Sequence, residues 1–248
     1  MIFPGYKRHR MESKKKLGII GGMGSRAGVT FLKKIVDFCP VYGDQEFVEI
    51  IYHNNPHIPD RTKAILYKGT SPRTELLRSI RLLNRNKVDI IAMACMSSYY
   101  YFEELSKHTE AYFPDPITLL AGHLKAGFPL LRRVGLLAST GAILSGIFHR
   151  RLEQQGLPVV HLDEDEQEQM FMRSLYMPGG LKSGNVSEAA KSLFLQAVDS
   201  LQNKQIDVLV GGCSEVSILL PGNALPVPYV DIMDVLAKDI IGCCYSTM

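Results

Sequence analysis

Short apolar runs alternate along the chain with segments in which apolar residues recur at helical spacing. Runs of the first kind are typical of strands that are buried on both faces of a parallel sheet, whereas the second spacing predicts amphipathic helices. The alternation therefore predicts an α/β protein with parallel sheets and right-handed crossovers. The predicted strands begin at residues 17, 47, 88, 134, 158 and 206. The first predicted helix spans 25–38, and its apolar face consists of Val29, Leu32, Ile35 and Val36.

The pattern occurs twice. Residues 134–141 (VGLLASTG) echo residues 17–24 (LGIIGGMG), and residues 226–231 resemble residues 113–117. A repeat of about 110–120 residues is too long for a solenoid unit and suits a duplicated α/β half. We therefore expect two similar lobes that are related by a pseudo-twofold axis, with the active site between them. The expected first lobe comprises 17–118 with 226–248, and the expected second lobe comprises 119–225.

Two of the predicted strands end in a cysteine that is followed by small polar residues. These segments are 88–98 (VDIIAMACMSS), which contains Cys95, and 206–216 (IDVLVGGCSEV), which contains Cys213. Ligands of parallel α/β sheets bind beyond the carboxyl ends of the strands. We therefore expect the two thiols to face each other across one cleft and to move a proton on and off a carbon atom, one as thiolate and the other as thiol.

A single free cysteine is more often an inert core residue than a functional one. Two cysteines at matching positions of a repeat favour a functional role. The other three cysteines have no such context, and we interpret them as structural: Cys39, Cys243 and Cys244. No C-x-x-C motif and no clustered histidine spacing occurs in the sequence, so we expect no metal site.

Polar residues in other loops extend the candidate site. The glycine-rich turn before the helix 25–38 suits a small anion, but its spacing is not that of a dinucleotide-binding motif. Arg61 ends a polar loop that directly follows the second strand, and its planar guanidinium suits bidentate binding of a carboxylate. Lys182 is the single lysine of the glycine-rich loop 177–184.

Composition sets the class of protein. The chain has 248 residues, of which 46% are hydrophobic and 21% charged, as is ordinary for a soluble globular protein. No apolar run approaches the roughly 20 residues that span a bilayer, and the N-terminus lacks the apolar region of a secretory signal. We therefore expect a cytoplasmic protein with no membrane contact, in which the five cysteines are free thiols.

The net charge of +3 is unevenly distributed. Residues 1–16 carry six basic side chains against Glu12 alone, which leaves the rest of the chain at −2. A basic stretch of this kind is either a patch for nucleic acid or a solvated leader. No aromatic interleaving and no nucleic-acid-binding motif accompanies it. We therefore expect a disordered leader and no nucleic-acid partner.

Three motifs together resemble the signatures of the aspartate/glutamate racemase family. They are 18–24 (GIIGGMG), 54–61 (NNPHIPDR) and 212–215 (GCSE), and the resemblance runs from about residue 17 to the C-terminus. It implies two Rossmann-like lobes, no pyridoxal phosphate or other cofactor, an amino-acid substrate and a homodimer. It further implies an isomerase that racemises aspartate or glutamate by proton transfer at Cα between two cysteines.

By position, the resemblance assigns a role to each candidate residue. Cys95 and Cys213 correspond to the acid/base thiols. Arg61 corresponds to the residue that holds the side-chain carboxylate, and Lys182 to a second cationic contact. Asn54 or Asn55 corresponds to the residue that holds the amino-acid head group. The remaining positions line the substrate site or flank the thiols: Met23, Gly24, Ser25, Ser97, Ser214 and Glu215.

The sequence departs from the family pattern after the first thiol. The family usually has Cys-Asn-Thr there, often followed by a histidine, whereas this chain has Cys95-Met96-Ser97-Ser98-Tyr99. Met96 cannot make the hydrogen bonds of an amide side chain, and a buried polar group left unpaired costs about 1–3 kcal/mol. Two alternatives therefore accompany the racemase hypothesis. One is a related isomerase or decarboxylase of diacids, and the other is a catalytically weakened homologue that binds an amino acid.

Overall fold

The computed structural model describes residues 15–220 and 225–245. Most of the expected leader, residues 1–14, therefore lies outside the described residues. Lys16, the last residue of the predicted leader, is the first residue of strand β1. The backbone N–H of Lys16 donates a hydrogen bond to the Asp89 side chain, and the ammonium group of Lys16 forms an ion pair with Glu49 on the next strand.

The first sheet has three parallel strands in the order β2-β1-β3. Its register places Leu17 of the central strand beside Ile50 on one side and Ile90 on the other. Tyr112 forms a single parallel bridge to Ile90 on the far side of β3. The strands are β1 (Lys16–Gly21), β2 (Glu49–Asn54) and β3 (Ile90–Met93).

The second sheet has four parallel strands in the equivalent order, β5-β4-β6-β7. Its fourth strand occupies the place that the Tyr112 bridge takes in the first sheet. Every residue of β3, β4 and β6 is buried, as the apolar runs predict. The duplicated α/β fold with parallel sheets is thus confirmed. The strands are β4 (Val134–Leu137), β5 (Val159–Val160), β6 (Val208–Gly211) and β7 (Tyr229–Asp231).

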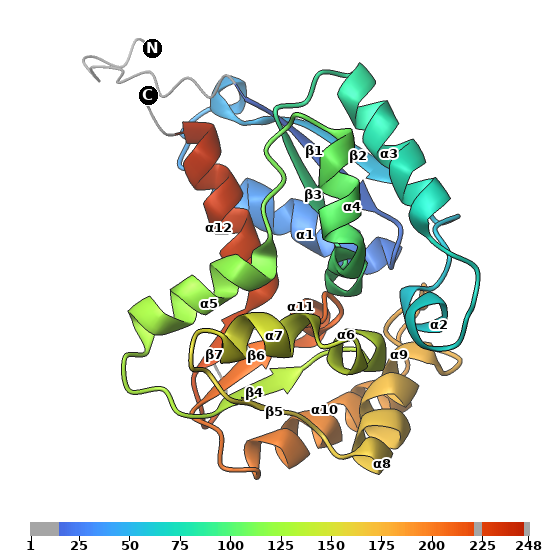
Figure 1. Ribbon diagram of the computed structural model, residues 1–248, viewed down its shortest axis with the longest axis vertical. Helices are drawn as coiled ribbons and strands as arrows, with labels where there is room; N and C mark the ends of the chain where they lie inside the picture. The colour runs from blue at the N-terminus through green and yellow to red at the C-terminus, as the bar shows by residue number, and fades with distance from the viewer. Residues whose placement is uncertain (1–14, 221–224, 246–248) are drawn as a thin grey trace, which may run out of the picture.

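The helices of the first half follow its strands around the upper sheet in Figure 1. Phe31 and Ile35 of the helix α1 are buried, whereas Val29 is 56% and Val36 41% exposed, so the predicted apolar face was wrong in part. Gly28 brings α1 close to β2, since a Cβ there would lie 2.3 Å from the hydroxyl oxygen of Tyr52. The α-helices are α1 (Ser25–Phe38), α2 (Arg61–Leu66), α3 (Arg73–Arg85) and α4 (Phe102–Leu105). The short 3-10 helices are η1 (Asp44–Glu46), η2 (Met96–Tyr101) and η3 (Ser106–His108).

The helices of the second half surround the lower sheet. A π-helical segment, η4 (Gln167–Met172), lies between two short α-helices and breaks the regular helical bonding there. The α-helices are α6 (Thr140–Leu144), α7 (Ile147–Glu153), α8 (Glu164–Glu166), α9 (Arg173–Tyr176), α10 (Glu188–Gln202) and α11 (Val216–Leu219). Within the described residues, no helix is long and apolar enough to cross a membrane.

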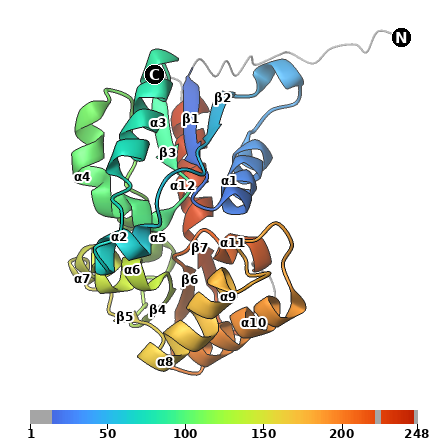
Figure 2. The ribbon, with the colours of Figure 1, turned by 90° about the vertical axis from the view of Figure 1, so that its right-hand side faces the viewer.

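Two helices cross between the lobes. α5 (Pro116–Gly127) follows the first sheet but packs against α7 of the second lobe, and α12 (Ile232–Tyr245) follows the second sheet but packs against α1 of the first. The two helices also pack against each other, as Figures 1 and 2 show. The C-terminal segment expected in the first lobe is therefore divided, because β7 pairs with β6 of the second sheet.

Each crossing helix is preceded by an aspartate that pairs with a base of the other lobe. Lys34 Nζ lies 3.1 Å from Asp231 Oδ2 and 2.5 Å from Asp234 Oδ1. Arg151 Nε lies 2.5 Å from Asp115 Oδ2. Lys34 and Arg151 stand 117 positions apart in the sequence, and the two aspartates, 115 and 231, stand 116 apart. The two ion pairs are therefore equivalent under the repeat and join the lobes on both sides.

Candidate active site

One cavity contains both predicted thiols. The cavity is small, and both lobes contribute to its wall. The loops after β3 and β6 bring the two cysteines there from the carboxyl ends of their strands, as the sequence predicts. The first lobe contributes Arg61, Thr62, Cys95, Met96 and Ser97. The predicted residues that the second lobe contributes are Lys182, Cys213, Ser214 and Glu215.

Cys95 lies among groups that favour its thiolate. The side chain is only 5% exposed, and its Sγ lies 3.3 Å from Ser97 Oγ. Burial opposes ionisation, but the positive charges of Arg61 and Lys182 hold the pKa of Cys95 below its ordinary value. As a thiolate, Cys95 can accept a proton from a bound ligand.

Cys213 lies in the opposite electrostatic environment. Its Sγ donates a hydrogen bond to Glu215 Oε2 at 2.9 Å, and the hydroxyl of Ser214 donates to the same oxygen at 3.2 Å. Burial and the negative charge of Glu215 raise the pKa of Cys213 well above its ordinary value. Cys213 is therefore held as a neutral thiol, which can give a proton to a bound ligand.

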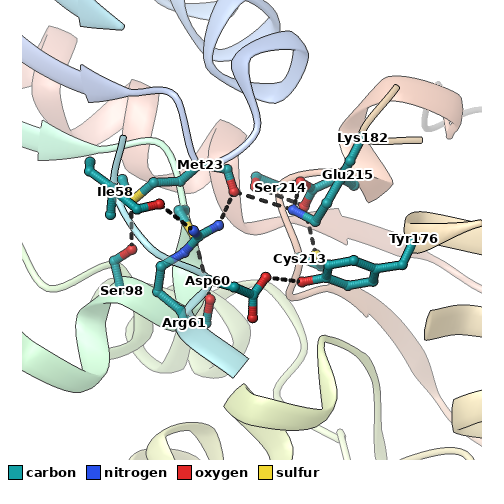
Figure 3. Close-up of polar contacts among 12 residues, drawn as sticks. Met23, Ile58, Asp60, Arg61, Ser98, Tyr176, Lys182, Cys213, Ser214 and Glu215 are labelled. Atoms are coloured by element: carbon teal, nitrogen blue, oxygen red, sulfur yellow. Dashed lines mark hydrogen bonds and ion pairs between the residues drawn. The ribbon is translucent and has the colours of Figure 1, made fainter. Parts of the chain in front are cut away.

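Glu215 links Cys213 to the cation of the neighbouring loop. The Glu215 carboxylate is 2% exposed and forms an ion pair with Lys182 through its other oxygen, Oε1. Burial alone would raise the pKa of Glu215, but the charge of Lys182 brings it below the ordinary value. The ammonium group of Lys182 also donates to the backbone carbonyl of Met23 at 3.2 Å, so this charge cluster spans both lobes (Figure 3).

Arg61 is the first residue of α2, whose N-terminus is capped by the Asp60 side chain. The Arg61 guanidinium is buried and donates to three backbone carbonyls of its own lobe. Nη1 donates to Pro59 at 3.0 Å and to Ile58 at 3.4 Å, and Nη2 donates to Met23. Figure 3 shows the bonds to Ile58 and Met23. Together the three bonds fix the guanidinium, which also interacts with Cys95.

The glycine-rich turn contributes backbone rather than side chains to the site. Gly22 has φ +91°, and a Cβ there would lie 2.3 Å from the carbonyl of Asn55, so glycine is required on both counts. A Cβ on Gly24 would lie 3.1 Å from Glu215 Oε1, which places this turn against the charge cluster. Met23 offers its carbonyl oxygen to both cations, whereas Ser25 is exposed at the start of α1.

The two asparagines do not line the cavity. Asn55 is buried, and its Nδ2 donates to Glu75 Oε2 at 3.0 Å and to Ser79 Oγ at 3.1 Å. Its backbone N–H donates to Gly21 at 3.2 Å, so it fastens the second motif to the first. Asn54 is exposed and accepts a hydrogen bond from the hydroxyl of Tyr52. In this structure both asparagines build the loop scaffold, which differs from the expected contact with an amino-acid head group.

The cavity also has lining residues that the sequence pattern did not single out. They are Thr62, Ser139, Leu175 and Tyr176. Only Ser139 carried a sequence signal, since it follows β4 in the repeat of the glycine-rich turn. Tyr176 ends α9, and its hydroxyl donates across the lobes to Asp60 Oδ2 at 2.7 Å. Leu175 and Met96 add apolar surface to an otherwise polar wall.

The arrangement suits transfer of protons at a carbon atom. A group that favours proton acceptance and a group that favours proton donation line one small cavity that is largely closed to solvent. Arg61 and Lys182 supply positive charge there for an anionic ligand. Among the described residues, no group of three or more histidines, cysteines or acidic side chains is arranged to hold a metal ion.

Comparisons with known proteins agree with this geometry. The family model for Asp/Glu/hydantoin racemases matches residues 20–240. An aspartate racemase from Picrophilus torridus is 26% identical in sequence and superposes with a TM-score of 0.81, covering 92% of this chain and 94% of its own. A glutamate racemase from Francisella tularensis, solved in complex with D-glutamate, shares the two-lobed fold at 17% identity and a TM-score of 0.65, over 95% of this chain and 85% of its own.

A curated relative supports the same assignment over nearly the whole length. The broad specificity amino-acid racemase RacX of Bacillus subtilis is 21% identical over 237 residues, which is 91% of this chain and 96% of the relative. The resemblance first suggested by the three sequence motifs is thus confirmed. The chain belongs to the Asp/Glu/hydantoin racemase family.

Proposed function

We propose that this protein is a cofactor-independent amino-acid racemase in which Cys95 and Cys213 act on opposite faces of the substrate Cα. The proposal rests on the pair of thiols in one interlobe cavity. Positive charges lie near Cys95, whereas the negative charge of Glu215 lies next to Cys213. One thiolate and one thiol is the protonation state that a two-base racemisation requires.

The proposed reaction moves two protons and leaves the substrate otherwise unchanged. The Cys95 thiolate takes the proton from Cα, and the electron pair of the broken C–H bond is delocalised into the α-carboxylate. The S–H bond of Cys213 then breaks, and its proton goes to the opposite face of Cα. The product is the other enantiomer, with Cys95 as thiol and Cys213 as thiolate, and the reverse reaction restores the first state.

Aspartate is the proposed substrate, with glutamate next. The buried Arg61 and the half-buried Lys182 support a substrate with two carboxylates, since the α-carboxylate and the side-chain carboxylate can each approach one cation. The developing negative charge at Cα and its carboxylate is stabilised by the same cations in a dry site. The similarity to an aspartate racemase from Picrophilus torridus supports placing aspartate before glutamate as the substrate.

A racemase of less polar amino acids is the second candidate. Lys182 is already paired with Glu215, and Met96 and Leu175 line the cavity with apolar atoms. Both features favour an uncharged side chain, and the similar protein from Bacillus subtilis is a broad specificity racemase. A homodimer is proposed from the family resemblance for either candidate, and light scattering at several protein concentrations tests it.

Exchange of the α-proton in D₂O tests the proposed function. The protein is incubated with each enantiomer of aspartate, glutamate and several neutral amino acids, and the α-proton is followed by NMR without added pyridoxal phosphate. We expect exchange from both enantiomers of aspartate. Cys95→Ser and Cys213→Ser should each abolish racemisation, while each retains exchange from one enantiomer only, opposite in the two variants. Loss of one acid/base group lowers the rate of racemisation by about 10²–10⁴-fold.

Cys39→Ser is the matched control, because Cys39 lies at the end of α1 and does not line the cavity. This variant should racemise at the wild-type rate. Racemisation at the wild-type rate by either cavity variant would contradict the two-thiol mechanism. If the folded, reduced protein exchanged no amino acid at all, the racemase proposal itself would be wrong. Exchange from neutral but not acidic substrates would favour the second candidate.

A further inference from the structure

The two thiols of the cavity face opposite kinds of hydrogen-bonding partner. A carboxylate only accepts hydrogen bonds, so the 2.9 Å contact from Cys213 Sγ to Glu215 Oε2 requires a hydrogen on that sulfur. A guanidinium only donates, so Arg61 beside Cys95 favours a sulfur that has lost its hydrogen. The asymmetry is therefore built into the neighbours of each thiol.

Glu215 is held in place for this contact on every side. Its Oε1 is paired with Lys182, and its Oε2 accepts from Ser214 at 3.2 Å as well as from Cys213. The glycine-rich turn leaves space for the carboxylate, because a Cβ on Gly24 would lie 3.1 Å from Oε1. At 2% exposure the Glu215 carboxylate cannot turn toward solvent without breaking its ion pair with the half-buried Lys182.

We propose that Glu215 is a positioning residue that keeps the proton on Cys213, so that the free enzyme rests with Cys95 as the proton acceptor and Cys213 as the proton donor. This inference rests on the proposed two-thiol mechanism for its meaning in catalysis. The free enzyme then deprotonates directly the enantiomer whose Cα–H bond points at Cys95. The opposite protonation state, with a thiolate next to the Glu215 carboxylate, is the less populated one.

The charged and titratable groups around Cys213 come from both lobes. Glu215 follows it in its own loop, and Lys182 and Tyr176 approach from the preceding segment of the second lobe. Cys95 and Arg61 line the same cavity from the first lobe. Of these groups, Glu215 is the one that forms a direct hydrogen bond with the Cys213 sulfur, so its charge has the largest effect on how tightly Cys213 holds its proton.

The pH dependence of alkylation at each cysteine tests the inference without turnover. The protein is treated with iodoacetamide from pH 5 to pH 10, and mass spectrometry measures the rates at Cys95 and Cys213 separately. In the wild type, alkylation of Cys95 should begin at lower pH than alkylation of Cys213, because the thiolate is the reactive form. Both thiols line one cavity and are exposed to a similar extent, 5% for Cys95 and 8% for Cys213, so the order of alkylation reports their ionisation. The reverse order, or identical profiles, would overturn the inference.

Glu215→Gln should move the Cys213 profile to lower pH and speed its alkylation at pH 7.5, because the thiolate fraction rises about tenfold when the pKa falls by one. The Cys95 profile should move in the same direction but less, since Glu215 influences that thiol only at a distance. Glu215→Asp keeps the charge and should preserve most of the wild-type difference between the thiols. It also serves as the second variant if the glutamine variant is poorly folded.

Glu188→Gln is the matched control, because Glu188 is an exposed acid on α10 that also pairs with a lysine, Lys191. It should leave both alkylation profiles unchanged. An unchanged Cys213 profile in the folded Glu215→Gln variant would show that Glu215 only partners Lys182. The assay also separates this inference from the proposed function. Distinct thiol profiles in a protein without α-proton exchange would support the positioning role and contradict the racemase.

Discussion

At the scale of single residues, Arg61 shows how a buried cation can act on the chemistry without leaving its own lobe. Three backbone carbonyls hold the guanidinium, at Ile58, Pro59 and Met23, and its charge stabilises the Cys95 thiolate. Its fixed position means that a ligand carboxylate has to approach Arg61 rather than the reverse. The residue therefore supports both the loop scaffold and the acidity of the thiol.

Arg61→Gln should raise the pKa of Cys95 and move the acid limb of the racemisation rate to higher pH. It should also lower the free energy of unfolding, because a hydrogen bond from a charged donor contributes about 1.5–3 kcal/mol. Cys95 alkylation against pH and urea unfolding measure the two effects. The exposed Arg85→Gln on α3 is the control and should change neither. A Cys95 profile that stays at its wild-type position would contradict the electrostatic role of Arg61.

Most of the cavity residues that the sequence could identify are placed by strand ends, whereas Lys182 was identified in a glycine-rich loop between two helices. Cys95, Cys213 and Glu215 directly follow buried apolar runs, and the periodicity of those runs is a local property of the sequence. Tyr176 and Thr62 reach the cavity only because whole lobes pack together, and no local pattern reports that. The buried role of Asn55 was unpredictable for the same reason, since its partners lie on α3.

At the scale of elements, the alternation of strands and helices along the chain and the bounds of α1 were predictable from the sequence. The face of α1 that is buried was not. The face of α1 depends on how closely Gly28 approaches Tyr52, which is a tertiary contact. Residues 113–117 resemble 226–231 in sequence, yet the later segment forms the strand β7, whereas the earlier one has only the Tyr112 bridge before α5 begins at Pro116. Proline at the start of a helix is favourable there, because its missing N–H is not needed.

The segment 176–184, here called the strap, is the element that fastens the second lobe over the cavity. Tyr176 donates to Asp60 at 2.7 Å, and Lys182 donates to the Met23 carbonyl. From the other side, Arg26 of α1 donates to the backbone carbonyl of residue 183 at 3.4 Å. The strap thus contacts the first lobe at three points, and Figure 3 shows two of them near Cys213.

Tyr176→Phe should loosen the strap while leaving the aromatic ring in place. A hydrogen bond contributes about 1 kcal/mol, so amide hydrogen exchange in residues 177–184 should become about fivefold faster. Tyr67→Phe is the control, because this tyrosine is 66% exposed and does not line the cavity. Equal exchange rates in the strap of the wild type and of Tyr176→Phe would show that the Asp60 contact does not restrain it.

At the scale of the whole molecule, the two equivalent ion pairs join the lobes next to the crossing helices α5 and α12. Lys34 reaches Asp231 from α1, and Arg151 reaches Asp115 from α7. Burial raises the pKa of Asp231 in spite of the nearby Lys34 charge, so this carboxylate costs stability as pH rises through its titration. The pairing with Lys34 limits that cost.

Lys34→Met should therefore destabilise the protein by about 3 kcal/mol at pH 7, the usual effect of leaving a buried charge unpaired. The loss should shrink at acid pH, where Asp231 is protonated in both the folded and the unfolded chain. Urea unfolding at pH 7 and at acid pH measures the difference. Lys33→Met is the control, since the pair of Lys33 with Asp37 on the same helix is exposed. A loss that is independent of pH would contradict the assignment of the effect to Asp231.

The crossing of α5 and α12 has a consequence for the order in which parts of the chain can fold during synthesis. α12 covers α1, yet nearly the whole sequence is made between them, so the N-terminal lobe stays incomplete until the ribosome has passed residue 245. Early folding must then rely on the first sheet alone, with the surface meant for α12 exposed to water. A nascent chain stalled before Ile232 should bind chaperones through that surface. Neither half of this duplicated protein should be separable as an independent domain.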